Sequence, residues 1–331
     1  MSKAWPIVLL ASASCQLGTL VDPAPFDARN QHPVQLTGGQ LAPRAARAVS
    51  PGAAELLVKV DWTNLWLRHG AGVDRLETDG ELVRLAPRLR VGLGADLDLA
   101  VELPIMHAAG GVLDRLIELW HDLGGFVDGH RELFPRNRFK VSFERRQPDA
   151  SLVSAYQMQA RPISLGDLPV ELGWFPIDDG PWRAGLRAGV ELPTGDEAAG
   201  LGNGKFDAML GAAASWHEGP LAIFGWGGWS WVGTAARAQR AGMDYIDVAS
   251  GGIGGEVAVG QHVSALVQVN WEHSLLERLD DTHANRSQGF LWAGARIRLA
   301  NGAHVEIALG EDVIRGLSPD VTFHAALRLS W

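Results

Sequence analysis

The chain has 331 residues, a formal net charge of −9, 40 glycines, 13 tryptophans and a mean hydropathy of +0.01. The negative charge argues against a nucleic-acid partner, and scattered histidines with a single cysteine argue against a metal centre or another bound cofactor. So much glycine and tryptophan suits a sheet with alternating faces better than a doubly wound enzyme.

A short apolar run opens the chain. It extends from Ala4 to Ala13 behind the basic Lys3, which is too short for a spanning helix of about 20 residues but suits the core of a secretory signal. We therefore expect a signal over residues 1–14. Cys15 follows small residues directly and is a candidate for lipidation, whereas the alternative is ordinary cleavage after Ala11-Ser12-Ala13. As the lone cysteine it can form no disulfide within the chain.

The next segment, residues 15–53, is rich in Pro, Ala and Arg and shows no periodicity. We interpret it as a periplasmic lead-in rather than a domain. Alternation of apolar and polar residues begins near Glu55 and continues to Trp331, which predicts one closed antiparallel barrel over residues 54–331.

The alternation predicts about twelve strands of the usual membrane length of ~9–11 residues. They are expected at 55–68, 78–93, 96–106, 166–175, 182–192, 205–216, 220–232, 243–258, 261–273, 288–299, 303–311 and 320–331. The last is the most distinctive, because its apolar face runs without a break from Val321 to the terminal Trp331. Such an ending is typical of the closing strand of a bacterial transmembrane β-barrel.

The connections between these strands alternate in length. Those near 92–95, 177–181, 217–219, 259–261 and 300–302 are short, and those that start near 108, 194, 233 and 274 are longer. Short periplasmic turns and longer external loops are typical of outer-membrane barrels, so both termini are expected in the periplasm.

The long external insertion, residues 108–165, leaves two questions open. Its first part predicts an amphipathic helix over 112–123 with Leu113, Leu116, Ile117 and Trp120 on the apolar face. This helix could plug the barrel mouth, lie on the outer leaflet or cap the loop. The later part, 138–160, could be an external hairpin or two further strands of a fourteen-stranded barrel.

Several short motifs resemble an uncharacterised proteobacterial outer-membrane β-barrel family that carries a domain-of-unknown-function label. They are Phe26-Asp27-Ala28-Arg29-Asn30-Gln31-His32-Pro33, Phe134-Pro135-Arg136-Asn137-Arg138-Phe139, Leu165-Gly166-Asp167-Leu168, Leu192-Pro193-Thr194-Gly195-Asp196 and the terminal aromatic strand. The similarity covers most of the mature chain. It implies the fold and an outer-membrane location, and it implies no catalytic residues.

Many charges fall on the face expected to point into the lumen. They are Arg84, Arg88, Arg90, Asp96, Asp98, Glu102, Arg183, Arg187, Glu191, Arg296, Arg298, Glu306 and Arg328. A three-residue turn at 92–94 would pair Arg90 with Asp96, Arg88 with Asp98 and Arg84 with Glu102, and a turn at Asn301 would pair Arg296 with Glu306 and Arg298 with His304. Such ions either neutralise one another in a filled barrel or line a polar conduit.

Three further patterns bear on function. Trp62, Trp174, Trp182, Trp216, Trp271 and Trp331 fall near strand ends, where aromatic girdles are expected. His273-Ser274, followed by His283, Asn285 and Ser287, could form a lipid-hydrolase site at the rim, although the spacing differs from that of known barrel hydrolases. Asp196, Glu197 and Asn203 could bind a hard cation, but a solvated loop is the favoured interpretation.

We therefore interpret the chain as a bacterial outer-membrane β-barrel, not an enzyme, that acts as a passive channel for small solutes, gated or plugged by the external-loop helix. The alternative is a non-transporting structural or binding barrel with an ion-paired interior. The expected partners are outer-membrane lipid, a small solute and the barrel-insertion machinery, which would recognise the strand that ends at Trp331.

Overall fold

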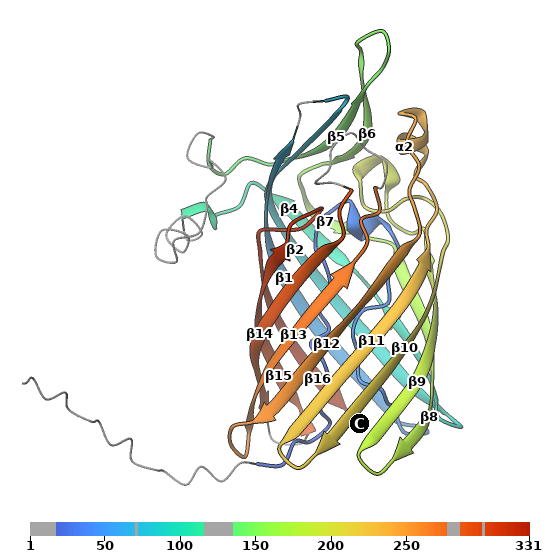
Figure 1. Ribbon diagram of the computed structural model, residues 1–331, viewed down its shortest axis with the longest axis vertical. Coiled ribbons are helices and arrows are strands. Elements are labelled where there is room, and N and C mark those ends of the chain that lie inside the picture. The colour runs from blue at the N-terminus through green and yellow to red at the C-terminus, as the bar shows by residue number, and fades with distance from the viewer. Residues whose placement is uncertain (1–17, 70–71, 116–134, 277–284, 300–301) are drawn as a thin grey trace, which may run out of the picture.

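A computed structural model describes residues 18–69, 72–115, 135–276, 285–299 and 302–331. The predicted signal, Cys15, Leu116, Ile117, Trp120 and His283 lie outside these residues. The described chain forms one tall β-barrel (Figure 1). Among the described residues, no helix has the length and apolar character that a membrane crossing requires.

The barrel is closed by twelve antiparallel strands. The chain up to Leu192 supplies β1 (Ala54–His69), β2 (Asp74–Gly94), β3 (Leu97–Glu102), β4 (Ile105–Ala109), β7 (Arg161–Leu165), β8 (Leu168–Asp179) and β9 (Trp182–Leu192). The second half supplies β10 (Asp207–Glu218), β11 (Leu221–Trp231), β12 (Val248–Ala258), β13 (Val263–Glu272), β14 (Gln288–Arg298), β15 (His304–Ile314) and β16 (Val321–Ser330). Each of the pairs β3–β4 and β7–β8 is one interrupted wall strand, and β1 joins both β2 and β16.

The remaining elements lie at the end of the barrel with the long loops (Figure 1). They are the hairpin of β5 (Lys140–Arg146) and β6 (Leu152–Met158), the short helix α2 (Ala236–Arg240) and the 3-10 turn η3 (Glu197–Ala199). The β5–β6 hairpin continues the upper part of β2 and joins no other wall strand, so it is an external hairpin. The predicted twelve-stranded barrel is thereby confirmed, and the fourteen-stranded alternative is wrong.

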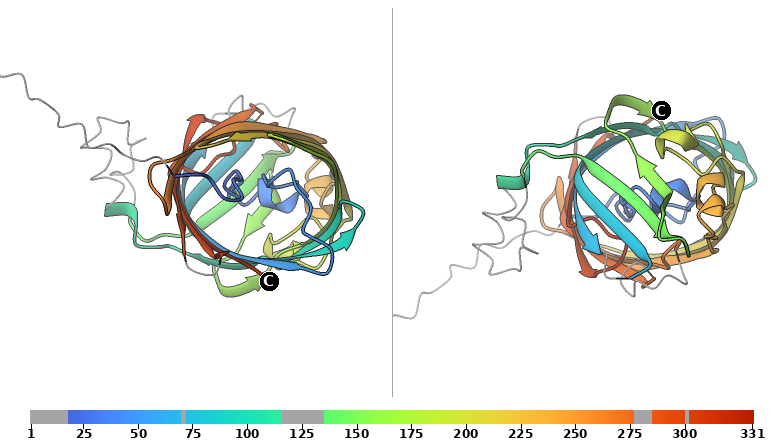
Figure 2. Two further views of the ribbon diagram at one scale, coloured as in Figure 1. Left: turned by 90° about the horizontal axis from the view of Figure 1, so that it is seen from below. Right: turned by 90° about the horizontal axis from the view of Figure 1, so that it is seen from above.

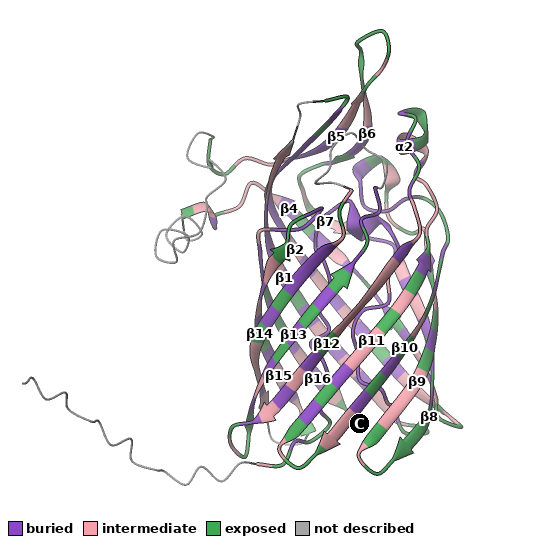
Figure 3. Cartoon of the chain, in the orientation of Figure 1, coloured by how far each residue is buried: buried purple, intermediate pink, exposed green. Residues whose placement is uncertain are grey.

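The strands alternate between exposed apolar and buried polar residues (Figure 3). In β13, Val263, Val267 and Val269 are exposed, whereas Gln268 and Asn270 are buried. An apolar outer face and a polar inner face are what a barrel in a bilayer requires, because lipid can solvate only the former. The alternation in the sequence therefore places a polar lining around the axis.

Residues 18–53, here called the lumen segment, run through the interior in a U (Figure 2). The first arm enters at the short-turn end, where Leu20 donates a hydrogen bond of 3.2 Å to the β10–β11 turn. The 3-10 turn η1 (Gln35–Thr37) is the apex, and its Gln35 side chain donates to the carbonyl of His273 at the far end of β13. The second arm returns to the β2–β3 turn, where Gly52 bonds Gly92 at 3.3 Å.

The prediction of a periplasmic lead-in over 15–53 was therefore wrong for the described residues 18–53. The lack of periodicity predicted a segment outside the barrel. In fact most of its residues are buried, because a chain without a strand pattern can follow the inner wall and satisfy it with side chains and irregular backbone. The predicted external helix has one described apolar residue, Leu113, which packs on the outward-facing Val321, Trp62 and Leu309 and not in the lumen.

Candidate functional site

The polar interior of the barrel, together with the lumen segment, is the candidate functional site. Ten of the predicted lumen charges are buried against it: Arg84, Arg88, Arg90, Asp98, Glu102, Arg187, Glu191, Arg296, Glu306 and Arg328. Asp96 is exposed in the β2–β3 turn, so its predicted inward position was wrong. Arg183 and Arg298 lie partly exposed at the short-turn rim, where Arg183 pairs with Asp178 at 3.0 Å.

The predicted pairing between β2 and β3 was shifted. The turn is formed by Ala95 and Asp96, both with positive φ, and Arg88 lies opposite Glu102. Gly92 is not a turn residue, because a Cβ there would lie 2.0 Å from the Ser50 carbonyl oxygen of the lumen segment. This glycine serves the close approach of two backbones, a role that looks the same as a turn in the sequence.

Other predicted pairs are present across the wall. Arg296 lies opposite Glu306 and bonds it at 3.1 Å, and Arg298 lies opposite His304. Arg84 pairs with Glu102, as predicted. Two further pairs, Arg90 with Asp98 at 2.6 Å and Arg187 with Glu171 at 2.5 Å, were not predicted. Arg328 reaches Glu306 at 3.3 Å. The wall thus carries a set of ion pairs that do not involve the lumen segment.

Several inward charges lack a charged neighbour in register, among them Lys59 and Glu272. Lys59 lies opposite Ala86 and Ala326, and Glu272 lies opposite Ser250 and Gln288. A buried charge needs a partner, so these positions demand one from elsewhere. For these two charges the lumen segment supplies partners in addition to Glu102 and Gln288 of the wall, and a charge without a partner in register is the sequence feature that could have revealed the segment.

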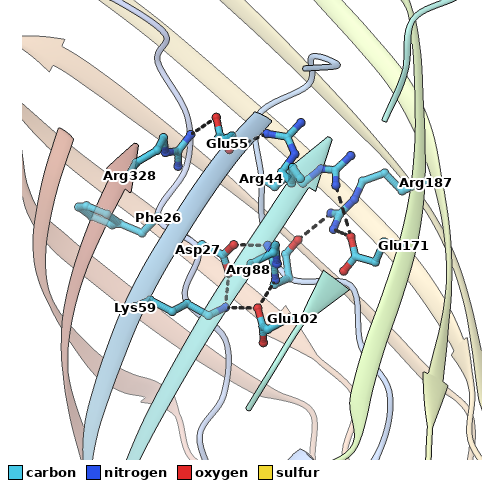
Figure 4. Close-up of polar contacts among 12 residues, drawn as sticks. Phe26, Asp27, Arg44, Glu55, Lys59, Arg88, Glu102, Glu171, Arg187 and Arg328 are labelled. Carbon is cyan, nitrogen blue, oxygen red and sulfur yellow. Dashed lines mark hydrogen bonds and ion pairs between the residues drawn. The ribbon is translucent and has the colours of Figure 1, made fainter. Parts of the chain in front are cut away.

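Asp27 of the lumen segment forms an ion pair with Lys59. Its carboxylate lies 2.5 Å from Lys59 Nζ and also pairs with Arg88 (Figure 4). Lys59 and Arg88 in turn contact Glu102, at 3.0 and 2.7 Å. Two carboxylates and two cations therefore alternate around a closed, buried ring.

Glu272 is satisfied by amides. Asn30, Gln35 and Gln40 of the lumen segment donate to its carboxylate at 2.7, 2.8 and 2.7 Å, and Gln288 of the wall donates at 2.8 Å. This carboxylate holds both arms of the U, because Asn30 precedes the apex and Gln40 follows it.

The second arm is anchored by an arginine. Arg44 lies near Glu171, at 3.6 Å (Figure 4). It also pairs with Asp98 at 2.8 Å, and its guanidinium lies 5.2 Å from the centre of the Phe175 ring. Both carboxylates also have wall arginines, Arg90 and Arg187. Removal of Arg44 would therefore leave neither of them without a wall partner.

The apex is covered by apolar residues of the external loops. Val34 and Leu36 belong to a buried cluster that includes Tyr245, Leu275 and Leu317. Small cavities border the segment: one of about 30 Å³ beside Leu20 and Arg296, and one of about 20 Å³ beside Asn30 and Glu272. These volumes hold about one water molecule each, so the segment fills the lumen here.

The predicted rim hydrolase is not assembled as expected. Ser274 is buried, and its hydroxyl accepts from the Leu276 N–H. His273 Nδ1 instead hydrogen-bonds the Ser287 hydroxyl at 3.1 Å on the exposed rim. In the cation-site candidate, Asp196 pairs with Arg161, Glu197 accepts from the Arg237 N–H and Asn203 donates to Asp207, so the side chains bind separate protein partners.

Comparison with known proteins agrees with this architecture. Residues 4–331 match the family described as "Protein of unknown function (DUF3187)". The chain belongs to this family. The family assignment confirms the predicted resemblance to an outer-membrane barrel family of unknown function.

Solved structures show the fold. An outer-membrane channel from Pseudomonas putida F1 is similar with a TM-score of 0.56 and 14% identity, over 88% of this chain and 99% of that chain. The NanC porin is more distant, with a TM-score of 0.46 and 9% identity over 82% of this chain and 98% of that chain. The CymD monoaromatic hydrocarbon channel has a TM-score of 0.40 and 12% identity over 93% of this chain and 94% of that chain. No curated protein matches the sequence. The chain shares the β-barrel fold of the Pseudomonas putida channel.

Proposed function

We propose that this protein is an outer-membrane channel for small solutes, not an enzyme, and that the lumen segment is its gate. In this state the channel is closed. The gate is therefore the N-terminal segment and not the external-loop helix that the sequence suggested. The short-turn end, where the U begins and where Trp331 pairs with Ala54, faces the periplasm, and the long loops face outward.

One observation carries this proposal: four wall carboxylates keep a wall arginine without the lumen segment, and the segment fills the barrel without joining the sheet. Glu102, Asp98, Glu171 and Glu306 each have a wall arginine. Residues 18–53 contain no β-strand, so their withdrawal breaks side-chain contacts and a few backbone hydrogen bonds at the turns but no sheet ladder. The remaining lining would be polar and paired, as a water-filled conduit requires.

Single-channel conductance in planar bilayers tests the gate. The intact chain is compared with Asp27→Asn/Arg44→Gln, which loosens both arms while leaving the wall pairs in place. A matched control, Asp178→Asn/Arg183→Gln, removes an exposed pair at the rim. We expect the open probability of the first variant to rise at least about tenfold, since tenfold corresponds to ~1.4 kcal/mol and a buried pair is worth more.

The control should behave as the intact chain does. Heat-modifiable migration on gels establishes that each variant is folded. If the folded double variant remains silent at every voltage, the channel is refuted and the non-transporting barrel remains.

A further inference from the structure

We propose that the place taken by Phe26 and Asp27 is the channel's solute site, and that its solutes are small carboxylates joined by a short flexible chain to an aromatic or similarly apolar group. This proposal rests on the proposed function, because it takes Phe26 and Asp27 of the gate to occupy the site that the solute binds in the open channel. Its two halves, one cationic and one aromatic, are argued separately.

The cationic half is the ring around Asp27. Lys59, Arg84 and Arg88 all reach the wall carboxylate of Glu102, and Arg84 also lies 4.0 Å from the carboxylate of Asp61, which His324 shares. Asp27 supplies the second carboxylate, and no other residue of the lumen segment is seen to pair with Lys59 among the contacts of the described chain. Once Asp27 leaves, the buried cations outnumber the carboxylate that they share. A buried unbalanced charge is costly, so an incoming anion favours the open state.

The aromatic half holds the preceding residue. Phe26 is fully buried in an apolar cluster with Leu266, Phe290 and Trp292, and its ring lies 6.0 Å from that of His324. Gln268 fixes its backbone by accepting from the Phe26 N–H at 2.8 Å and donating to its carbonyl at 3.2 Å. Departure of Phe26 would leave room for one phenyl ring among aromatic walls, which favour such a ring by apolar contact and edge-to-face geometry.

The two halves are joined by adjacent residues, which limits the solute's length. About six chain atoms separate the ring of a phenylalanine from the carboxyl carbon of a following aspartate, by the covalent structure of a dipeptide. The linker is flexible, so a solute with a chain of that length or somewhat shorter spans both halves. A carboxylate without a ring fills only the cationic half, and a neutral amide with a ring fills only the aromatic half.

The test uses the intact chain and the probe 6-phenylhexanoate, with 6-phenylhexanamide and hexanoate as matched controls. Calorimetry in detergent measures binding, and planar bilayers measure open probability. We expect the aromatic carboxylate to bind and to raise open probability at least about tenfold over either control. Lys59→Met should weaken binding at least about tenfold, whereas the matched Lys140→Met at the external hairpin should not.

A second variant guards against misfolding of Lys59→Met. Asp27→Asn removes the competing carboxylate and leaves the wall cations in place, so it should tighten binding of 6-phenylhexanoate. Equal binding of the acid and the amide, or no change in either variant, refutes the site. If Asp27→Asn/Arg44→Gln conducts but no carboxylate binds, the site fails and the channel stands. If the carboxylate binds with the expected variant pattern but nothing conducts, the site stands and the channel fails.

Discussion

Individual charged residues on the inner wall bind the lumen segment. Lys59 and Glu272 have neutral neighbours in register, and each is met by the lumen segment, through Asp27 and through Asn30, Gln35 and Gln40. Buried ions of this kind are weak contributors to stability while paired but costly when one partner is removed. The segment is therefore held by specific contacts that single substitutions can loosen.

Asp27→Asn should expose the first arm to protease. Arg29 lies two residues away and is buried. Loss of a buried pair costs about 3–5 kcal/mol, and ~1.4 kcal/mol is tenfold in an equilibrium. Trypsin cleavage after Arg29, followed by mass spectrometry, should therefore accelerate at least about tenfold. Asp178→Asn is the matched control, and equal resistance of Asp27→Asn and the intact chain would contradict the assigned contact.

The position of the Trp292 ring requires a glycine at position 310. A Cβ at Gly310 would lie 2.6 Å from the ring of Trp292, which is itself buried in the lumen. Gly310→Ala should destabilise the barrel by about 1–3 kcal/mol through overpacking. The double variant Gly310→Ala/Trp292→Phe should recover part of that loss, because the smaller ring vacates the space, and unfolding in denaturant measures the coupling. Strict additivity of the two changes would be inconsistent with this contact.

At the scale of elements, strands were predictable and the lumen segment was not. A strand is recognised by the alternation of apolar and polar residues, and β9 begins and ends at the predicted residues, Trp182 and Leu192. The lumen segment has no period, because its burial is set by the wall around it and not by a repeating face of its own. The predicted β2–β3 register was wrong for a related reason, because Gly92 allows the lumen segment to approach closely and does not form the turn.

The second arm offers a place for a reversible lock. A Cβ at Gly39 would lie 3.2 Å from the Cβ of Glu191, close to the range of disulfides, which is about 3.5–4.5 Å. In a Cys15→Ser background, Gly39→Cys/Glu191→Cys should form a disulfide that keeps this arm in the lumen. Full conductance should disappear on oxidation and return with reductant. Full conductance with the bond demonstrably closed would show that this arm is not part of the gate.

For the whole molecule, the proposed orientation rests on the asymmetry of its two ends. The short turns and both ends of the described chain lie at one mouth, and the hairpin of β5 and β6 lies at the other (Figure 1). Charge-rich external loops and brief periplasmic turns are the usual arrangement.

An epitope inserted at Asp149, in the exposed turn between β5 and β6, should therefore be stained by antibody on intact cells. The same epitope inserted in the turn at Gly219 should be stained only after the outer membrane is permeabilised, and it is the matched control. Staining of the Gly219 insertion on intact cells would reverse the assigned orientation.

Because the lumen segment is continuous with β1 through Ala53 and Ala54, it never leaves the neighbourhood of the site it fills. A tethered occupant competes at an effective concentration on the order of millimolar, whatever the amount of protein in the membrane. A free solute must reach a comparable concentration, weighted by its relative affinity, before it displaces the tether. On the proposed function, the channel would therefore stay closed at low solute concentration and open once the solute concentration passes that threshold.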